Sequence, residues 1–316
     1  MNVLVTGAAG FLGSRLIKGL LSGAPGLPDV SRIVAADVVR CPVTDSRIDT
    51  RVGTIAGADY IRSIVDADVH LVCHLAAVLS GQSEAEFDLG MQINVDATRN
   101  LLEACRRLPR PPRFVFTSSV AVFGGRLPEV VPDGMAPTPE SSYGTEKAIG
   151  ELLVSDYSRR GFVDGIACRL PTIAVRPGRP NSALSSFVSG IIREPLAGID
   201  TVCPVPLGTR LWISSPGVCI HNLLHAARIP APELDGRRVV TLPGLSVTAE
   251  EMLSSLERLA GTQARARVHC EVDREILRIV STWPGAFEVS RAARMGFIAD
   301  GGIDAIVRQF IAERTG

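Results

Sequence analysis

The stretch Met1–Leu16, MNVLVTGAAGFLGSRL, decides the fold. Its apolar run Val3–Val5 leads directly into a glycine-rich turn, and apolar residues at helical spacing follow. The pattern predicts a strand, a tight turn and the first turn of a helix, with no residues to spare between them. At such a junction the amide N–H groups of the helix N-terminus bind an anionic group such as a phosphate.

The glycines of this turn have separate tasks in a turn that binds a dinucleotide. Gly7 allows the tight turn off the strand, Gly10 lets the backbone approach the pyrophosphate, and Gly13 lets the helix pack on the sheet. Phe11 and Leu12 open the helix and complete the predicted phosphate-binding turn. Because a strand and a helix flank the glycines, the stretch predicts a dinucleotide site, with a ligand-free glycine turn as the alternative.

A second short strand is predicted over residues 31–37, and it ends in Asp37. Asp37 follows the glycine turn by roughly 20 residues, the spacing of the carboxylate that binds the adenosine ribose. A carboxylate there accepts hydrogen bonds from both ribose hydroxyls and repels a 2′-phosphate, so NAD is predicted over NADP. Arg15 and Arg40 leave NADP open, and a solvated strand end is the alternative for Asp37.

Strands and helices alternate through the first half of the chain. Further strands are predicted over 48–55, 69–77, 113–119 and 165–170, and helices over 11–21, 57–65, 87–108 and 141–160. This alternation predicts an α/β protein with a doubly wound parallel sheet, the Rossmann arrangement. Ligands of such sheets bind beyond the carboxyl ends of the strands, where Gly7, Asp37, Ala76 and Ser119 lie. Ala76 therefore joins the predicted cofactor site.

The alternation of strands and helices breaks after Pro171. Residues 1–175 are predicted to form a dinucleotide-binding domain, and residues 176–316 mainly a smaller, mixed substrate-binding domain. Part of the second segment, about 215–245, is predicted to return to the sheet.

Composition narrows the classes of protein further. The chain has 316 residues, is 46% hydrophobic and carries 33 basic and 33 acidic side chains, so its formal net charge is zero. This predicts a large core and no nucleic-acid partner or anionic membrane surface. Seven scattered cysteines without a C-x-x-C pair favour reduced thiols and a cytoplasmic location. No signal peptide is predicted, and no apolar run reaches the ~20 residues of a membrane span. No metal site is predicted, because His221 and His225 have no third ligand in the sequence.

Tyr143 and Lys147 are four residues apart, so a helix over 141–160 presents both from one face. An ammonium near a phenol stabilises the phenolate and lowers its pKa from about 10, which makes the tyrosine a usable base near neutral pH. Ser119, at the end of a neighbouring strand, can hold a substrate oxygen with its hydroxyl. A surface pair is the alternative for Tyr-x-x-x-Lys alone, and its place after the nucleotide turn favours catalysis.

These motifs together resemble the extended short-chain dehydrogenases/reductases, in particular the NAD-dependent epimerase/dehydratase family. The matching positions are Gly7, Gly10, Phe11, Gly13, Asp37, His74–Ala77, Asn94, Val95, Ser118, Ser119, Val122, Phe123, Gly124, Tyr143 and Lys147. The resemblance implies that Tyr143 is the general acid/base, and that Lys147 holds the nicotinamide ribose and tunes Tyr143. It implies that Ser119 orients the substrate hydroxyl, with Thr117 and Ser118 as competing hydroxyls.

The resemblance also implies a role for Asn94 and an oligomeric state. Asn94 is counted with the cofactor site because it would order the central helix or a water chain, and a helix-interior asparagine without a role is the alternative. The family implies a homodimer formed through the helices at 87–108 and 141–160.

Two segments narrow the resemblance within the family. Val78–Gln82 and the arginine-rich stretch Arg169–Leu196 resemble the D-erythronate dehydrogenase group. This implies NAD-dependent oxidation of the C2 hydroxyl of a four-carbon sugar acid, D-erythronate, to 2-dehydro-D-erythronate. A nucleotide-sugar epimerase or dehydratase on the same scaffold is the first alternative, and a non-catalytic NAD-sensing protein is the second.

A small polyhydroxy acid needs a cation for its carboxylate and polar groups for its hydroxyls. The candidate carboxylate ligands are Arg176, Arg179, Arg193 and Arg210. The candidate hydroxyl ligands are Ser80, Gln82 and Asn181. The predicted substrate site consists of Ser80, Ser119, Tyr143, Arg176, Arg179 and Asn181. A surface salt bridge is the alternative for each arginine.

Overall fold

The computed structural model describes residues 1–178 and 185–315. The chain forms two compact units, and each unit has its own core. Unit 1 comprises Met1–Val122, Ser141–Arg169 and Ile220–Val240, and unit 2 comprises Phe123–Glu140, Leu170–Cys219 and Thr241–Gly316. Phe123–Glu140, which the sequence-based division at residue 175 leaves in the first domain, clusters with unit 2.

Unit 1 is built on a seven-stranded sheet with the order β10-β6-β5-β4-β1-β2-β3. Its strands are β1 (Asn2–Thr6), β2 (Arg32–Asp37), β3 (Ile48–Val52), β4 (Leu71–His74), β5 (Arg113–Ser119), β6 (Asp164–Leu170) and β10 (Val239–Thr241). β1 pairs in parallel with β2 on one side and with β4 on the other, so the strand order reverses at β1. Ligands of doubly wound sheets bind at this switch point.

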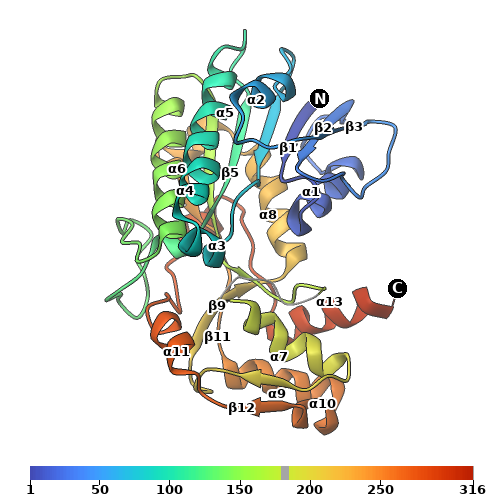
Figure 1. Ribbon diagram of the computed structural model, residues 1–316, viewed down its shortest axis with the longest axis vertical. Helices are drawn as coiled ribbons and strands as arrows, with labels where there is room; N and C mark the ends of the chain where they lie inside the picture. The colour runs from blue at the N-terminus through green and yellow to red at the C-terminus, as the bar shows by residue number, and fades with distance from the viewer. Residues whose placement is uncertain (179–184, 316) are drawn as a thin grey trace. The chain divides into compact units, whose positions relative to one another are not determined.

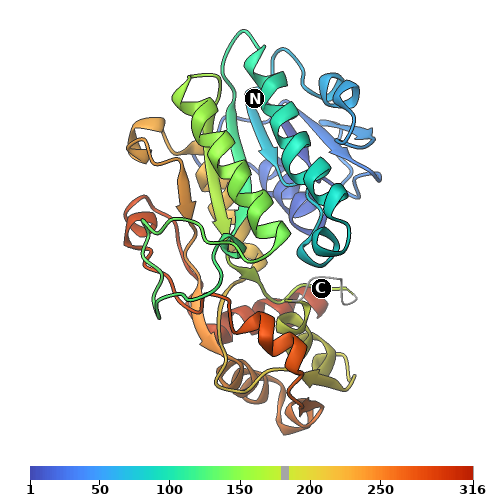
Figure 2. The same cartoon turned by 60° about the vertical axis from the view of Figure 1, so that its left-hand side comes forward.

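Helices cover both faces of this sheet. On one face lie α2 (Ala58–Ile64), α5 (Ala97–Arg106) and α6 (Ser142–Arg159), and on the other lie α1 (Phe11–Leu21) and the Ile220–Arg228 part of α8 (Pro216–Arg228) (Figure 1). Figure 2 shows α5 and α6 running side by side. The predicted doubly wound α/β sheet is confirmed.

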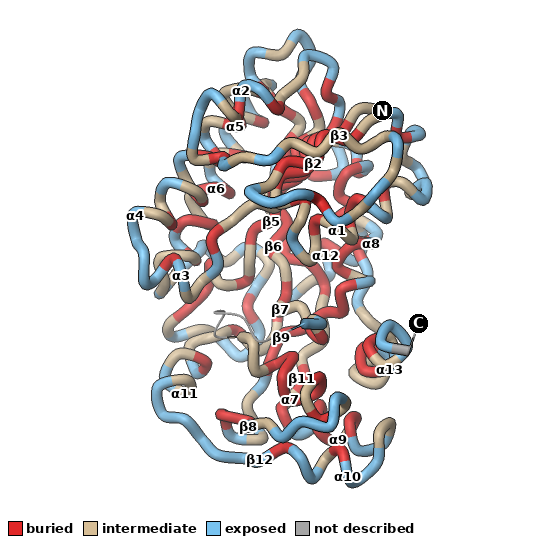
Figure 3. The backbone as a smooth tube through the Cα atoms, turned by 45° about the vertical axis from the view of Figure 1, so that its right-hand side comes forward, coloured by how far each residue is buried: buried red, intermediate tan, exposed pale blue. Residues whose placement is uncertain are grey.

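The strands are buried between the two helical layers, which explains their nearly continuous apolar sequences. Figure 3 shows β2 buried along most of its length, and β1 is buried from Val3 to Thr6. On the face of α5 and α6, Leu4 and Phe114 from the sheet pack with Leu101 and Val154 from the helices. On the other face, α1 and α8 approach closely, since a Cβ at Gly19 would lie 2.9 Å from Leu224 Cδ1.

The segment after β4 differs from the prediction of one helix over 87–108. The chain first forms α3 (Ser80–Ala85) and α4 (Phe87–Gly90), and a π-helical segment η1 (Met91–Asp96) then leads into α5. The π-helical turn carries Asn94, whose buried side chain bonds to groups outside its own helix. Single π-helical turns within α-helices are frequent at functional sites. Two short helical turns, η2 (Val120–Val122) and η3 (Ala231–Leu234), complete unit 1.

Unit 2 is a mixed α/β unit with two small sheets. β11 (Leu245–Thr248) pairs antiparallel with β9 (Arg210–Ser214), which pairs in parallel with β7 (Thr172–Ile173). β8 (Thr201–Cys203) and β12 (Val268–Cys270) form a parallel pair. The helices are α7 (Ser186–Leu196), α9 (Ala249–Ala260), α10 (Thr262–Ala266), α11 (Arg274–Val280), α12 (Ser290–Arg294) and α13 (Ile303–Thr315).

Local signals explain several of these elements. Thr248 caps α9, because its side chain accepts from the Glu251 N–H while the Glu251 carboxylate accepts from the Thr248 N–H. Phe123 and Trp212 both pack on Phe287, at ring-centroid distances of 5.6 and 5.4 Å. This aromatic contact packs the Phe123–Glu140 loop against the rest of unit 2.

All seven cysteines are free thiols, and Cys270 alone is exposed. Burial raises the pKa of the Cys73, Cys105 and Cys168 thiols to about 12. Within residues 1–178 and 185–315, no helix combines the length and apolar character that crossing a membrane requires.

Candidate active site

The glycine turn between β1 and α1 leaves no room for side chains at two of its positions. Gly7 has φ +71°, and a Cβ there would lie 2.7 Å from the Ala76 backbone nitrogen. A Cβ at Gly13 would lie 2.0 Å from the Gly7 carbonyl oxygen. Gly10 precedes α1 and provides no side-chain cap, so the amides of the first helical turn remain for a ligand. This arrangement fits a pyrophosphate.

Asp37 ends β2 beside this turn. Its Oδ2 accepts a hydrogen bond of 2.9 Å from the Ala9 N–H, which fixes the carboxylate next to the glycine turn. Because the side chain is only partly buried, it remains accessible to a ribose. Backbone amides for a pyrophosphate and a carboxylate for a ribose together fit an NAD molecule.

Tyr143 and Lys147 lie on the first turns of α6, which begins at an N-cap where the Ser141 hydroxyl accepts from the Gly144 N–H. Lys147 Nζ donates a hydrogen bond of 2.9 Å to the Thr117 carbonyl at the end of β5. It lies 5.6 Å from the centre of the Tyr143 ring. The structure therefore brings Tyr143 and Lys147 together at the carboxyl end of β5.

The environment of Lys147 lowers the pKa of its ammonium group toward the neutral range. The side chain is 2% exposed, and burial lowers the pKa of Lys147 to about 8, opposed by the negative charges of Glu146 and Glu151. Lys18 and Lys147 are the two lysines among the 33 basic residues of the sequence. An amine is thus retained here in a chain that otherwise uses arginine, whose pKa does not reach the neutral range.

The three hydroxyls at the end of β5 differ in what they bind. Thr117 Oγ1 donates to the His74 carbonyl at 3.1 Å, and Ser118 Oγ donates to Glu151 Oε1 at 2.5 Å. Ser119 Oγ accepts from the Ala121 N–H at 3.1 Å, and among the described residues its O–H donates to no protein acceptor. Ser119 is therefore the hydroxyl of the three that remains available for a substrate oxygen.

His74 has a structural role. Its ring nitrogens contact Thr6 Oγ1 at 2.7 Å and Thr98 Oγ1 at 2.9 Å, and burial lowers the pKa of His74 to about 3. The imidazole is therefore neutral at physiological pH and packs beneath the site. Within the described residues, no three His, Cys, Asp or Glu side chains gather as metal ligands.

Asn94 binds protein groups on three sides. Its Oδ1 accepts from the Val78 N–H at 2.9 Å, and its Nδ2 donates to the Val78 carbonyl at 3.0 Å and to Glu146 Oε2 at 2.6 Å. Ser83 Oγ also donates to Glu146 Oε2, at 3.1 Å. The sequence analysis singled out Asn94 but missed Ser83 and Glu146, because nothing in the sequence places them beside it.

Besides Ser119 and Tyr143, four substrate residues were predicted, and they fall into three groups. Ser80 opens α3 in unit 1, three residues before the buried Ser83. Arg176, in unit 2, is partly buried, and its guanidinium lies 3.5 Å from Ser185 Oγ. Arg179 and Asn181 lie outside the described residues.

The other two candidate arginines have protein partners in unit 2. Arg193 is largely buried and donates to the Arg176 carbonyl at 2.8 Å and to Glu194 Oε1 at 2.5 Å. Arg210 is exposed and donates to Ser246 Oγ at 3.3 Å. Arg193 thus supports the backbone of Arg176.

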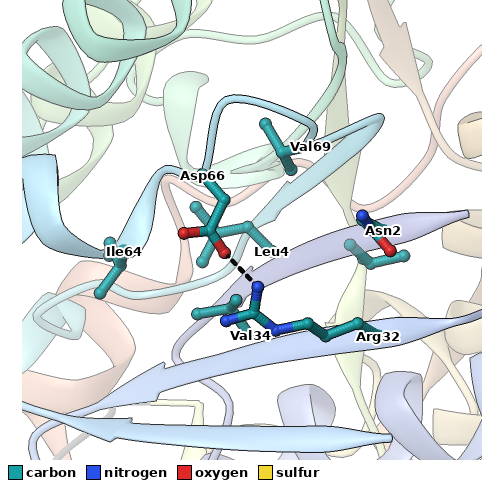
Figure 4. A pocket seen from close by; sticks show the side chains of 8 residues that line it. Asn2, Leu4, Arg32, Val34, Ile64, Asp66 and Val69 are labelled. Atoms are coloured by element: carbon teal, nitrogen blue, oxygen red, sulfur yellow. Dashed lines mark ion pairs between the residues drawn. The ribbon is translucent and has the colours of Figure 1, made fainter.

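A separate pocket opens at the amino ends of β1 and β2 (Figure 4). It is lined by Asn2, Val3, Leu4, Arg32, Val34, Ile64, Asp66 and Val69. Arg32 and Asp66 form an ion pair of 2.8 Å there. Because the glycine turn and Asp37 lie at the carboxyl ends of the same strands, this pocket is distinct from the candidate active site.

Comparison with known proteins identifies the family. A model of the NAD dependent epimerase/dehydratase family matches residues 3–209. The chain is 50% identical over 319 residues to a D-erythronate dehydrogenase of Cupriavidus necator, covering 99% of this chain and 98% of that protein. It is 44% identical over 313 residues to a D-erythronate dehydrogenase of Haemophilus influenzae, covering 98% of this chain and 99% of that protein.

A solved structure agrees over the full length. A crystal structure described as a nucleoside-diphosphate-sugar epimerase from Agrobacterium tumefaciens has 40% sequence identity and a TM-score of 0.96, covering 100% of this chain and 95% of that one. The resemblance inferred from the sequence motifs is confirmed. The chain belongs to the NAD-dependent epimerase/dehydratase family, and NAD is its cofactor.

Proposed function

We propose that this protein is an NAD-dependent oxidoreductase that oxidises the C2 hydroxyl of D-erythronate to 2-dehydro-D-erythronate. The observation that carries the reaction is the placement of Lys147 Nζ between the Thr117 carbonyl and the Tyr143 ring. The substrate is supported by two relatives that are named D-erythronate dehydrogenases, at 50% and 44% identity over nearly the whole chain.

The residues at the end of β5 divide the work of the reaction. Tyr143, as phenolate, takes the proton of the C2 hydroxyl, and Lys147 in its charged form stabilises that phenolate. Ser119 donates a hydrogen bond to the substrate oxygen and so orients the C2–H bond. Bound NAD supplies the acceptor for the hydride that leaves C2. The products are the 2-keto acid, NADH and a proton.

The cofactor site follows from the same sheet edge. Gly7, Gly10 and Gly13 shape the turn, and the amides of Phe11 and Leu12 lie in the first turn of α1. Asp37 binds the ribose, and Ala76 contacts the turn at Gly7. Asn94 supports this edge through the Val78 backbone.

We assign the carboxylate of D-erythronate to Arg176, because guanidinium binds carboxylate through two parallel hydrogen bonds. Ser80 is assigned to a substrate hydroxyl. From the sequence alone, Arg179 is assigned to the substrate carboxylate and Asn181 to a substrate hydroxyl. Arg193 is left out of the substrate site because Glu194 and the Arg176 carbonyl occupy its donors.

A nucleotide-sugar epimerase is the second candidate, since the Agrobacterium tumefaciens structure is described as one. The two functions differ in cofactor turnover. A dehydrogenase releases NADH with each turnover, whereas an epimerase returns the hydride to its substrate. Net NADH formation from D-erythronate therefore favours the first, and thermal protection by a nucleotide sugar without NADH release favours the second.

The test compares wild type with Tyr143→Phe over a panel of aldonates, measured by NADH absorbance. We expect NADH formation with D-erythronate, and a loss of kcat of about 10²- to 10⁴-fold in the variant because the base is removed. Tyr157→Phe is the matched control, since Tyr157 is on the same helix and its hydroxyl donates to Glu103. Near-normal turnover by Tyr143→Phe would contradict the proposed mechanism.

We also propose that the protein is a cytoplasmic homodimer. Phe87 on α4 and Leu152 on α6 are 58% and 71% exposed, so each of these helices leaves apolar surface uncovered. Both lie within the helical runs, 87–108 and 141–160, through which the family resemblance implies a homodimer. Seven cysteines, none of which forms a disulfide in the described residues, support a reducing compartment. Sedimentation velocity tests the oligomeric state.

A further inference from the structure

Glu146 is a fully buried carboxylate that the proposed reaction does not use. It stands on α6, directly before Lys147, and is 0% exposed. Asn94 and Ser83 both donate to its Oε2, at 2.6 and 3.1 Å. Its Oε1 has no hydrogen-bond partner among the described residues. A Cβ at Gly90 would lie 2.3 Å from Oε1, so glycine at residue 90 leaves room for this carboxylate in its present position.

A second buried carboxylate on the same helix shows what is unusual about Glu146. Glu151 forms a two-pronged pair with Arg169, with Nε–Oε1 and Nη2–Oε2 distances of 2.8 and 2.7 Å. Glu146 receives only neutral donors, and within the described residues it takes part in no ion pair. A buried carboxylate without a compensating charge is costly. The negative charge of Glu146 acts through space on Lys147, the next residue of α6, without forming an ion pair with it among the described residues.

The charged groups around Lys147 are few. Glu151 is neutralised by Arg169 from β6, and His74 from β4 is neutral because burial lowers its pKa to about 3. Tyr143 lies one turn earlier on α6. Phe116 from β5 contributes an aromatic face 4.8 Å from Lys147 Nζ. Glu146 is thus the negative group near Lys147 that has no other cation, and it raises the pKa of Lys147 against the effect of burial.

Glu146 also links two segments that carry predicted site residues. Through Asn94 it is joined to the N–H and carbonyl of Val78, the residue that leads from β4 toward α3. Through Ser83 it is joined to α3 itself, which begins at Ser80. One carboxylate therefore connects the Val78–Ser83 segment to the helical turn of Tyr143 and Lys147.

We propose that Glu146 is a positioning residue of this active site. Its buried carboxylate provides the counter-charge of Lys147 and fastens the Val78–Ser83 segment to α6. The proposal rests on the proposed function in assigning Lys147 to the reaction. The charge effect itself is measurable on the protein without substrate.

The test uses the fact that the sequence contains two lysines, Lys18 and Lys147. In protein labelled with ¹³C at lysine Cε, NMR yields one titration curve for each, and the exposed Lys18 serves as the internal reference. We expect Glu146→Gln to lower the pKa of Lys147 by about 1, a tenfold loss of proton affinity. The alkaline limb of kcat/KM should move to lower pH by the same amount, because Lys147 then loses its proton sooner.

Three further variants separate the charge of Glu146 from its hydrogen bonds. Glu146→Asp retains the charge but retracts it, so the pKa of Lys147 should fall by a smaller amount while KM for D-erythronate rises. Ser83→Ala removes the hydroxyl that bonds to Glu146, Asn94 and the Val78 carbonyl but removes no charge, so the Lys147 titration should stay as in wild type. Asp156→Asn is the matched control for charge removal, because Asp156 lies exposed on α6 and pairs with Arg159.

An unchanged Lys147 titration in Glu146→Gln would overturn the proposal. Should the glutamine variant fail to fold, an unchanged titration in Glu146→Asp overturns it equally. Absence of NADH formation from D-erythronate in wild type would instead contradict the proposed function. That result leaves the NMR titration intact, so the two failures are distinguishable.

Discussion

The glycine turn of unit 1 and the arginines of the Arg176–Leu196 segment of unit 2 depend on different constraints. At Gly13 the backbone leaves no space, since a Cβ would lie 2.0 Å from a carbonyl oxygen. At Arg176 and Arg193 there is space for long side chains, and their partners decide their roles. A position fixed by excluded volume accepts one residue type, whereas a position fixed by charge accepts several. The first kind of position is therefore recognisable from sequence, and the second is not.

Replacing Gly13 tests the steric side of this comparison and has the largest expected effect. Gly13→Ala should weaken NAD binding by at least about 1,000-fold, or about 4 kcal/mol, because the turn must open to admit the Cβ. Isothermal titration calorimetry with NAD measures it. Gly57→Ala is the control, since a Cβ there meets nothing closer than 3.8 Å. Near wild-type affinity in Gly13→Ala would show that the turn adapts freely.

The two arginines of unit 2 test the charged side of the comparison. Arg193→Met should reduce the free energy of unfolding by about 3 kcal/mol, because it leaves Glu194 largely buried without its cation. Arg176→Met should reduce the free energy of unfolding by less than Arg193→Met does, and it should raise KM for D-erythronate by about 10- to 100-fold, because charge-assisted hydrogen bonds to the substrate carboxylate are lost.

Urea denaturation and steady-state kinetics on both variants separate the two roles. The double variant Arg193→Met, Glu194→Gln is the control, because neutralising both partners should recover most of the lost stability. The assignment of Arg176 fails if Arg193→Met raises KM while Arg176→Met does not.

The fold of unit 1 was predictable because its signals are local. Val3–Val5 and the other apolar runs predict buried parallel strands, and each is followed by a helix of regular periodicity. Over 261–301 the sequence analysis assigned no element, although α10, β12, α11 and α12 lie there. Each of these has seven residues or fewer, so tertiary packing rather than local propensity stabilises it.

The residues of the candidate site also divide into those with a local sequence signal and those whose contacts depend on the fold. The glycines, Asp37, Tyr143 and Lys147 were found from their types and spacing. Glu146 stands next to Lys147 in the printed sequence, yet its partner Asn94 is 52 residues away, and only folding shows the contact. The π-helical turn was missed as well, and it carries Asn94, whose side chain bonds outside its own helix.

Asp37 combines both constraints and provides the finest test. Its charge discriminates against a 2′-phosphate, while the N–H of Ala9 in the glycine turn holds the carboxylate in place at 2.9 Å. Asp37→Asn keeps an oxygen that can accept this hydrogen bond and removes the charge. We expect the ratio of kcat/KM for NAD to that for NADP to fall about tenfold, equivalent to about 1.4 kcal/mol.

Steady-state kinetics with both cofactors measures this ratio, and Asp59→Asn on α2 is the matched control because Asp59 is exposed. If the ratio is unchanged in Asp37→Asn, the preference for NAD does not come from the charge at the end of β2. The preference would then come from the shape of the site at Val38 and Val39, the two exposed residues that follow Asp37. A fall in the ratio that comes from weaker NAD use alone would show that Asp37 acts through ribose binding and not through repulsion.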